Sequence, residues 1–300
     1  MEVTIGGRDI SVGGKLVRIA YPVGDGYHFL EEPEALFESI RKSKTRIDLF
    51  TFMQRLPETQ PKFKYPMEWD NFAALPISTF DNWWNKQIGF KARNKAKQAE
   101  KKGVVVRRAT FDDELVRGIW EVYNETMVRQ GKPNAHYGKD LERVRKEEET
   151  FMDHSVFIGA FLEHKLIGFI KLVADPTGNQ AGLMNIVSMI QHRDKAPTNA
   201  LLVEAVRICA ERQIPYLVYS SFAYGKKQTS TLSDFKERNG FQRIEIPRYY
   251  VPLTSLGRAA YRLKLHKQFA DRLPAPLLAK LRGLRNSWYN RKLQSVPEAS

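Results

Sequence analysis

The hydrophobic residues between Val104 and Thr254 form segments that alternate between strand-like and helix-like spacing. Apolar runs predict strands over 104–109, 156–162, 166–173, 183–190, 216–222 and 241–251. Leu115, Ile119 and Val122 recur at helical spacing after the first of these, and Pro197 opens a further helix. The run 183–190 lacks alternation, so we expect it to be covered on both faces. This order predicts an α/β (α+β) fold with a mixed central sheet flanked by helices.

The residues before this region predict a smaller set of elements. Strand-like segments at 15–20, 46–52 and 73–77 accompany a helix at 33–42. A capping-box pattern at Ser78 starts a long predicted helix that runs to Gly103, and it is flanked by basic residues: Lys91, Arg93, Lys95, Lys97, Lys101 and Lys102. We therefore divide the chain into residues 1–103, 104–254 and 255–300.

Charge is concentrated in the last of these parts. The chain carries a formal net charge of +14, which indicates an anionic partner. From 256 to 300 there are ten Lys or Arg residues against Asp271 and Glu298. Leu277, Leu281 and Trp288 share one side of a predicted amphipathic helix. It fits an anionic membrane surface, although helices packed on the protein with a solvated basic face explain the pattern equally well. Nucleic acid is the third candidate.

Several classes of protein are disfavoured by what the sequence lacks. Cys209 is the single cysteine, which excludes an internal disulfide and a cysteine-rich metal site, and its helical neighbours predict that it is buried. His and carboxylate residues do not recur at metal-ligand spacing, so no metal is expected. No run of about 18 apolar residues is present. We expect a cytoplasmic protein that is peripheral at the inner face of the membrane.

The order of elements resembles the GNAT acyltransferase fold, and three segments are similar to its Fem-type branch. These are the basic helix at 91–102, the segment Phe235-Lys236-Glu237-Arg238-Asn239-Gly240-Phe241 and the strand 247–252. Fem-type proteins pair two GNAT-like lobes and take amino acids from aminoacyl-tRNA. The resemblance implies that 104–254 is the acyltransferase domain, preceded by an incomplete GNAT-like lobe and followed by a basic helical tail.

In GNAT enzymes a Gln/Arg-x-x-Gly-x-Gly/Ala loop wraps the pyrophosphate of coenzyme A. The matching register here is Arg193-Asp194-Lys195-Ala196-Pro197-Thr198, in which both glycines are replaced. Ala196 resists positive φ and Pro197 has no N–H to donate. The resemblance implies an acyl-CoA donor, acetyl-CoA first, bound by Val187, Ser188, His192, Arg193, Lys195, Ala196, Thr198 and Asn199.

The catalytic groups of many GNAT enzymes are also replaced. Phe235 occupies the place of the tyrosine that protonates the leaving thiolate. Tyr219 and Tyr224 are nearby substitutes, and Tyr224 is the better of the two because it follows the end of the strand. The strand 183–190 has no carboxylate, but Asn185 is able to orient a water. His136, in the connection 129–137, titrates in the range that suits a general base. We assign the catalytic roles to His136, Tyr224 and Asn185, and substrate binding to Arg129, Tyr137, Ser220 and Ser221.

Three functions are compatible with these residues. The first is an N-acyltransferase that moves an acyl group from acyl-CoA to the amine of a small-molecule or lipid-linked, cell-envelope acceptor. The second is a Fem-type transferase that uses aminoacyl-tRNA, which would explain the altered loop and the basic helix. The third is a non-catalytic GNAT-like binding module. The sequence leaves the oligomeric state open.

Overall fold

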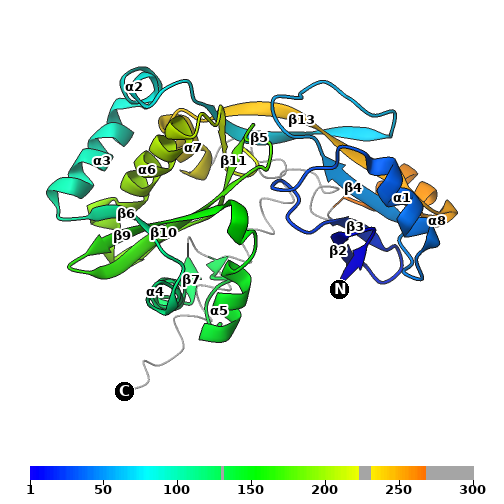
Figure 1. Ribbon diagram of the computed structural model, residues 1–300, viewed down its shortest axis with the longest axis horizontal. Coiled ribbons are helices and arrows are strands. Elements are labelled where there is room, and N and C mark those ends of the chain that lie inside the picture. Colours follow the sequence, from blue (N-terminus) through cyan, green and yellow to red (C-terminus); the bar gives the residue numbers. More distant parts are fainter. Residues whose placement is uncertain (130–131, 223–230, 268–300) are drawn as a thin grey trace, which may run out of the picture. The chain divides into compact units, whose positions relative to one another are not determined.

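The computed structural model describes residues 1–129, 132–222 and 231–267 (Figure 1). The described residues form two compact units. The first comprises 1–79, 174–182 and 209–267, and the second comprises 80–173 and 183–208. This division follows spatial contacts, whereas the boundaries at 103 and 254 follow the order of the chain and stay a prediction.

The first unit is built on a mostly antiparallel set of strands in the order β1-β2-β3-β4-β13-β5-β12. Only the β3–β4 pairing in this series is parallel. Helices α1 (Pro33–Lys42), α7 (Thr231–Arg238) and α8 (Ser255–Arg262) belong to the same unit. The strands are β1 (Glu2–Ile5), β2 (Arg8–Gly13), β3 (Ile19–Pro22), β4 (Leu49–Met53), β5 (Met67–Pro76), β12 (Tyr216–Val218) and β13 (Gln242–Pro252).

Aromatic side chains fill the core of the first unit. All five residues of β4 are buried, because one face meets α1 and the strand lies between β3 and β13. Tyr249 of β13 stacks on Phe52 at 5.1 Å between ring centroids, and Phe37 meets Phe50 edge to face at 5.4 Å. Aromatic pairs of this geometry add to the stability gained from apolar burial.

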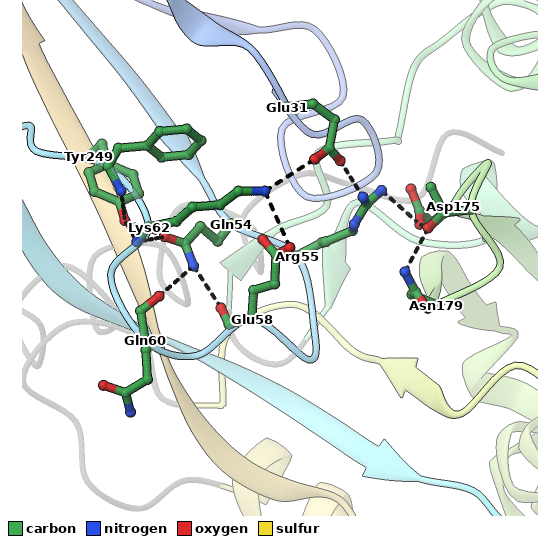
Figure 2. A network of polar contacts seen from close by, with 11 residues as sticks. Glu31, Gln54, Arg55, Glu58, Gln60, Lys62, Asp175, Asn179 and Tyr249 are labelled. Atoms are coloured by element: carbon green, nitrogen blue, oxygen red, sulfur yellow. Dashed lines mark hydrogen bonds and ion pairs between the residues drawn. The ribbon is translucent and has the colours of Figure 1, made fainter.

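A polar network holds the 54–62 loop of the first unit (Figure 2). The Gln54 amide donates to the carbonyls of Glu58 and Gln60 at 2.8 and 2.9 Å. The backbone N–H of Lys62 donates to Gln54 Oε1 at 2.9 Å and to the Tyr249 hydroxyl at 2.8 Å. In Figure 2 the Lys62 ammonium lies between two carboxylates. The loop therefore satisfies its backbone groups with side chains instead of a strand ladder.

The second unit contains the strands β11-β10-β9-β6 in that order, with helices on both sides (Figure 1). Strands β9 (Ser155–Leu162) and β10 (Lys165–Ala174) form a hairpin, and β6 (Val105–Ala109) pairs with β9. Helices α3 (Phe90–Lys101) and α6 (Pro197–Glu211) lie on one side of these strands, and α4 (Asp113–Asn124) and α5 (Leu141–Glu148) on the other. Glu163 and His164 both take positive φ, as a two-residue type I′ turn requires.

Strand β11 (Ala181–Ser188) is shared by the two units. Its first two residues, Ala181 and Gly182, pair in parallel with Leu217 and Val218 of β12. The remaining elements are short: β7 (Val128–Arg129), β8 (Lys132–Pro133), and the 3-10 turns η2 (Met152–His154) and η3 (Ile190–Lys195).

The prediction of one helix from Ser78 to Gly103 was wrong. The segment forms α2 (Phe80–Asn82) and a π-helical turn, η1 (Trp83–Gln87), before α3 begins. Ile88 and Gly89 between them have extended ψ values of 130° and 146°. Gly89 is the N-cap of α3, a role in which glycine is tolerated, so the chain restarts its helix there. The helical spacing of apolar residues continues across this break, so the spacing alone could not predict it.

The burial predicted for Cys209 is confirmed. Cys209 is buried, and burial raises its pKa to about 12, so the thiol is inert at neutral pH. Within the described ranges, no His, Cys, Asp and Glu residues group into a metal site. No helix in those same ranges is long and apolar enough to cross a bilayer. Of the predicted basic tail, residues 268–300, including Trp288, lie outside the described residues.

Candidate active site

A buried carboxylate, Glu148 at the end of α5, organises a polar cluster in the second unit. Glu148 is 2% exposed, and its Oε1 accepts a hydrogen bond from the Tyr123 hydroxyl at 2.7 Å. The Asn185 amide donates to both carboxylate oxygens, at 2.9 and 3.0 Å. Asn185 comes from β11 and Tyr123 from α4. Side chains from three elements thus meet at one carboxylate, next to a strand that has no carboxylate of its own.

A buried lysine completes this cluster. Lys171 of β10 is fully buried, and its ammonium donates to the Glu148 backbone carbonyl at 2.6 Å and to Thr150 Oγ1 at 3.0 Å. Burial lowers the pKa of Lys171 to about 8 and raises the pKa of Glu148, because both charged forms lose solvation. Burial, followed by the Glu148 charge, also raises the pKa of Tyr123. Perturbed titrations of this kind are typical of functional sites.

The α4–α5 connection brings the predicted base His136 to the same cluster. Its ring stacks on Tyr123, with 4.0 Å between ring centroids. The Lys139 ammonium lies 3.3 Å from His136 Nδ1. Burial, then the charge of Lys139, lowers the pKa of His136, so the imidazole is neutral at pH 7. A neutral ring that accepts from Lys139 at Nδ1 carries its proton on Nε2.

Side-chain amides fix this connection to α4. Asn134 donates to the carbonyls of Tyr123 and Thr126, both at 2.9 Å, and its Oδ1 accepts from the His136 N–H at 3.1 Å. The predicted substrate residue Tyr137 is 43% exposed, and its N–H donates to the Asn134 carbonyl. The loop is therefore held by a defined set of bonds that leave the Tyr137 side chain free for a ligand.

The predicted donor loop forms a closed 3-10 turn. The Glu125 carboxylate accepts from the N–H groups of Ile190 and Gln191 at 2.7 and 2.9 Å, at the start of η3. These amides are thereby occupied by the chain's own carboxylate instead of being free for phosphate. His192, Arg193 and Lys195 lie within the turn; Arg193 is exposed, and His192 and Lys195 are half-buried.

Ala196 takes the conformation that we expected it to resist. Its φ and ψ are 53° and 42°, the left-handed region in which the family pattern has glycine, and its N–H donates to the Arg193 carbonyl at 3.1 Å. Pro197 then occupies the first position of α6, where no N–H is needed. Ala196 thus takes positive φ without being glycine, and its N–H is already used within the turn.

The remaining predicted donor residues lie where β11 ends and α6 begins. Ser188 Oγ and Thr198 Oγ1 are 2.7 Å apart. The Arg129 guanidinium donates to the Ser188 carbonyl and lies 3.7 Å from Glu125. Val187 and Asn199 are half-buried on the same two elements. The structure thus brings Arg129, predicted for substrate, to the donor loop.

Two predicted substrate residues belong to the first unit. Ser220 is exposed with φ of 49°, and its carbonyl accepts from Ala73 N–H at 2.8 Å. The carbonyl of Ser221 accepts from the buried Lys236 ammonium at 2.6 Å. Burial lowers the pKa of Lys236 to about 8, and its Nζ lies 4.5 Å from the centre of the Tyr219 ring. Tyr224, the predicted acid, lies outside the described residues.

Sequence reasoning missed Glu148, Tyr123 and Lys171. Glu148 stands in the run Glu147-Glu148-Glu149, which reads as a solvated helix end. Tyr123 falls on the apolar face of its helix. Lys171 gave the one usable signal, because it interrupts the apolar run 166–173 and a charge there must find partners.

Basic side chains cover the outer face of α3. Lys91, Lys95 and Lys97 are exposed, and none of them has a carboxylate within ion-pair distance among the residues that the structure describes. Lys102, just after the helix, pairs with Asp194 at 3.0 Å. Phe90 at the start of the helix is 70% exposed. The helix presents positive charge and an aromatic ring on one surface.

Comparison with known proteins supports the fold. No family model and no curated protein sequence matches the chain. The structure of FemX superposes with a TM-score of 0.54 at 11% identity, covering 85% of this chain and 86% of FemX. L-PGS from Bacillus licheniformis gives 0.55 at 13% identity over 85% and 84% of the two chains. A domain assigned as the C-terminal domain of a lysylphosphatidylglycerol synthetase from Agrobacterium fabrum gives 0.54 at 13% over 88% and 86%. The chain shares the fold of FemX and of the L-PGS proteins, as its order of elements indicated.

Proposed function

We propose that the protein is an acyltransferase that moves an aminoacyl group from a tRNA to the amine of an acceptor. The observation that carries this proposal is the Glu148 cluster, which places a half-exposed amide, Asn185, over a buried carboxylate in a Fem-like fold. Such a cluster supplies a polar, shielded place for an amine. FemX and the L-PGS proteins span almost the same length of chain.

The transfer requires few proton movements. The amine nitrogen forms a bond to the donor carbonyl carbon, the bond from that carbon to the ester oxygen breaks, and the proton that the amine gives up passes to the leaving oxygen, which departs as the tRNA hydroxyl. His136 is neutral and stacked beside the cluster, which suits a group that receives or relays this proton. Tyr137, exposed on the same connection, would contact the acceptor.

The donor is inferred from the loop and from α3. Glu125 occupies the N–H groups of Ile190 and Gln191 just before the loop register 193–198. Within that register, Pro197 has no N–H and the Ala196 N–H already donates to the Arg193 carbonyl, which reduces the backbone donors open to a pyrophosphate. Lys91, Lys95 and Lys97 on α3 are exposed and have no carboxylate partner among the described residues, which suits sequence-independent contacts to the phosphates of an RNA backbone. Both observations favour a tRNA-borne donor.

An acyl-CoA donor is the second candidate, and one observation favours it. Ala196 adopts the left-handed conformation of the family glycine, so the loop keeps the backbone course associated with coenzyme A. In this case Arg193 and Lys195 supply the charge, and acetyl-CoA is the first donor to test. A lipid-linked acceptor at a membrane surface suits either donor, given the basic composition of residues 256–300.

Calorimetric titration of the full chain with total aminoacyl-tRNA and with coenzyme A separates the two donors. We expect tRNA to bind and its affinity to fall steeply between 50 and 200 mM salt, as phosphate contacts require. The triple variant K91Q/K95Q/K97Q should flatten the salt dependence, whereas the matched triple variant K15Q/K42Q/K44Q should not. If coenzyme A binds at millimolar concentration and tRNA does not bind, the donor is acyl-CoA instead of aminoacyl-tRNA. If neither ligand binds, the proposed transferase function is overturned.

A further inference from the structure

The Asn185 side chain is held in a single orientation. Its Nδ2 lies 2.9 Å from Glu148 Oε1 and 3.0 Å from Oε2. An ionised carboxylate accepts hydrogen bonds only, so the amide nitrogen must face Glu148 and the carbonyl oxygen must face away. Glu148 in turn is fixed by Tyr123, whose hydroxyl donates to Oε1 at 2.7 Å.

The carbonyl oxygen of Asn185 has no donor of its own. Among the described residues no hydrogen bond reaches Oδ1, and this atom is not fully buried. Asn185 is half-buried, so Oδ1 opens to solvent while Nδ2 is occupied. The side chain therefore presents a lone hydrogen-bond acceptor.

The neighbouring ammonium groups are already engaged. Lys171 donates to the Glu148 carbonyl and to Thr150, and Lys139 pairs with Glu147. The charges of Glu147 and Glu148 balance those of Lys139 and Lys171. An incoming group thus meets the acceptor oxygen without competition from a side-chain ammonium of this cluster.

From this arrangement we infer that Asn185 Oδ1 accepts an N–H of the amine that enters the site, and that Glu148 acts as a positioning residue by fixing the amide. The inference rests on the proposed function for its substrate class, a primary amine. The acceptor would therefore be recognised by the direction of one hydrogen bond. Molecules that donate an N–H to Asn185 Oδ1 bind, and molecules that offer only hydrogen-bond acceptors there do not.

The test uses the side-chain amide signals of Asn185 in the full chain, labelled with ¹⁵N-asparagine and assigned by the loss of signal in N185L. Methylammonium chloride is the probe, and tetramethylammonium chloride, which has the same charge but no N–H, is its control. We expect the Asn185 signals to move with methylammonium and to stay in place with tetramethylammonium. Equal responses to both salts, or none to either, would overturn the inference.

The positioning role is tested with E148Q. Its amide offers a single acceptor atom to Asn185, so the side chain turns more freely, and we expect methylammonium to bind about threefold more weakly. The matched control is E147Q, which alters the adjacent carboxylate that pairs with Lys139 and should leave the Asn185 response unchanged. An unchanged affinity in E148Q would show that Glu148 does not position the amide. Because the probe is no acyl donor, methylammonium binding without any transfer activity would reject the proposed function and leave this inference intact.

Discussion

The Arg248 cluster of the first unit and the Glu148 cluster of the second unit hold their charges in different ways. In the first unit, Arg248 lies between two carboxylates, at 2.8 Å from both Asp25 and Asp70. Arg55 likewise bridges Glu31 and Asp175 (Figure 2). In the second unit, the Glu148 carboxylate accepts from a phenol and an amide, and the Lys171 ammonium donates to a carbonyl and a hydroxyl.

This difference separates a structural use of charge from a functional one. The charges of Asp25 and Asp70 raise the pKa of Arg248 and outweigh the effect of its burial, whereas burial still raises the pKa of Asp25. Charges bound by neutral partners keep pKa values that burial shifts toward neutrality, as for Lys171 and Glu148. The first arrangement stabilises strands, and the second leaves groups able to respond to a ligand.

The largest effect is expected from R248A. Removal of the guanidinium leaves Asp25 and Asp70 facing each other in a largely buried place, and a broken buried pair costs roughly 3 kcal/mol. Urea unfolding measures the loss. The control is R243A, which removes the half-exposed Arg243–Glu245 pair and should cost under about 0.5 kcal/mol. Similar losses in both variants would contradict the structural role of the first arrangement.

G257A tests how closely the first unit is packed around another buried carboxyl residue, Asp48. A Cβ on Gly257 would lie 1.7 Å from the Asp48 backbone oxygen, so α8 would have to move. We expect a loss of roughly 2 kcal/mol in the free energy of unfolding. G13A is the matched control, because a Cβ there meets nothing within 4 Å. An unchanged free energy of unfolding in G257A would mean that α8 is loosely packed against Asp48.

Lys171 should make the stability depend on alkaline pH. Its pKa is about 8 in the folded protein and near 10.5 when unfolded, so between these values the unfolded chain binds more protons. Its contribution to stability is therefore present above about pH 10.5 and lost as pH falls through about 8. Compared with K171M, the wild type should gain stability from pH 8 to 9.5, as measured by chemical unfolding. Parallel profiles for the two proteins would show that Lys171 titrates normally.

The smallest effect concerns the N-terminus of α4, which carries Tyr123 of the cluster. Asp112 is the N-cap, since its carboxylate accepts from Leu115 N–H at 2.8 Å. D112A should cost about 1 kcal/mol in the free energy of unfolding. T110A is the control, because Thr110 also precedes the helix but is not its N-cap. An equal or larger loss in T110A would contradict the capping role of Asp112.

Most of the fold could be predicted from the sequence, because the spacing of apolar residues within each helix or strand is a local pattern. The hairpin β9–β10, the helix at 33–42 and the strand β6 lie where periodicity predicted them. The break at Ile88 and Gly89 was not predicted, because the helical spacing of apolar residues continues across it. Strands β1 and β2 escaped as well, since alternation over four to six residues is weak beside the Gly6-Gly7 turn.

The site was less accessible to sequence reasoning. Asn185 and His136 were predicted individually, and the structure joins them through Tyr123 and Glu148. That join depends on α4 and α5 meeting β11, and Tyr123 and Asn185 are 62 residues apart in the chain, so no local pattern encodes it. Ala196 shows the converse limit, because surrounding structure imposes a backbone conformation that the residue alone disfavours.

Strand β13 has a consequence for how the chain is made. It contains residues 242–252, yet it lies between β4 and β5, pairing with Thr51 on one side and Asn71 on the other. During synthesis, the edges of β4 and β5 therefore wait for a strand that leaves the ribosome almost 200 residues later. Pairing at such sequence separation slows folding and leaves strand edges exposed to other chains. The nascent protein should depend on chaperones until its last strand has emerged.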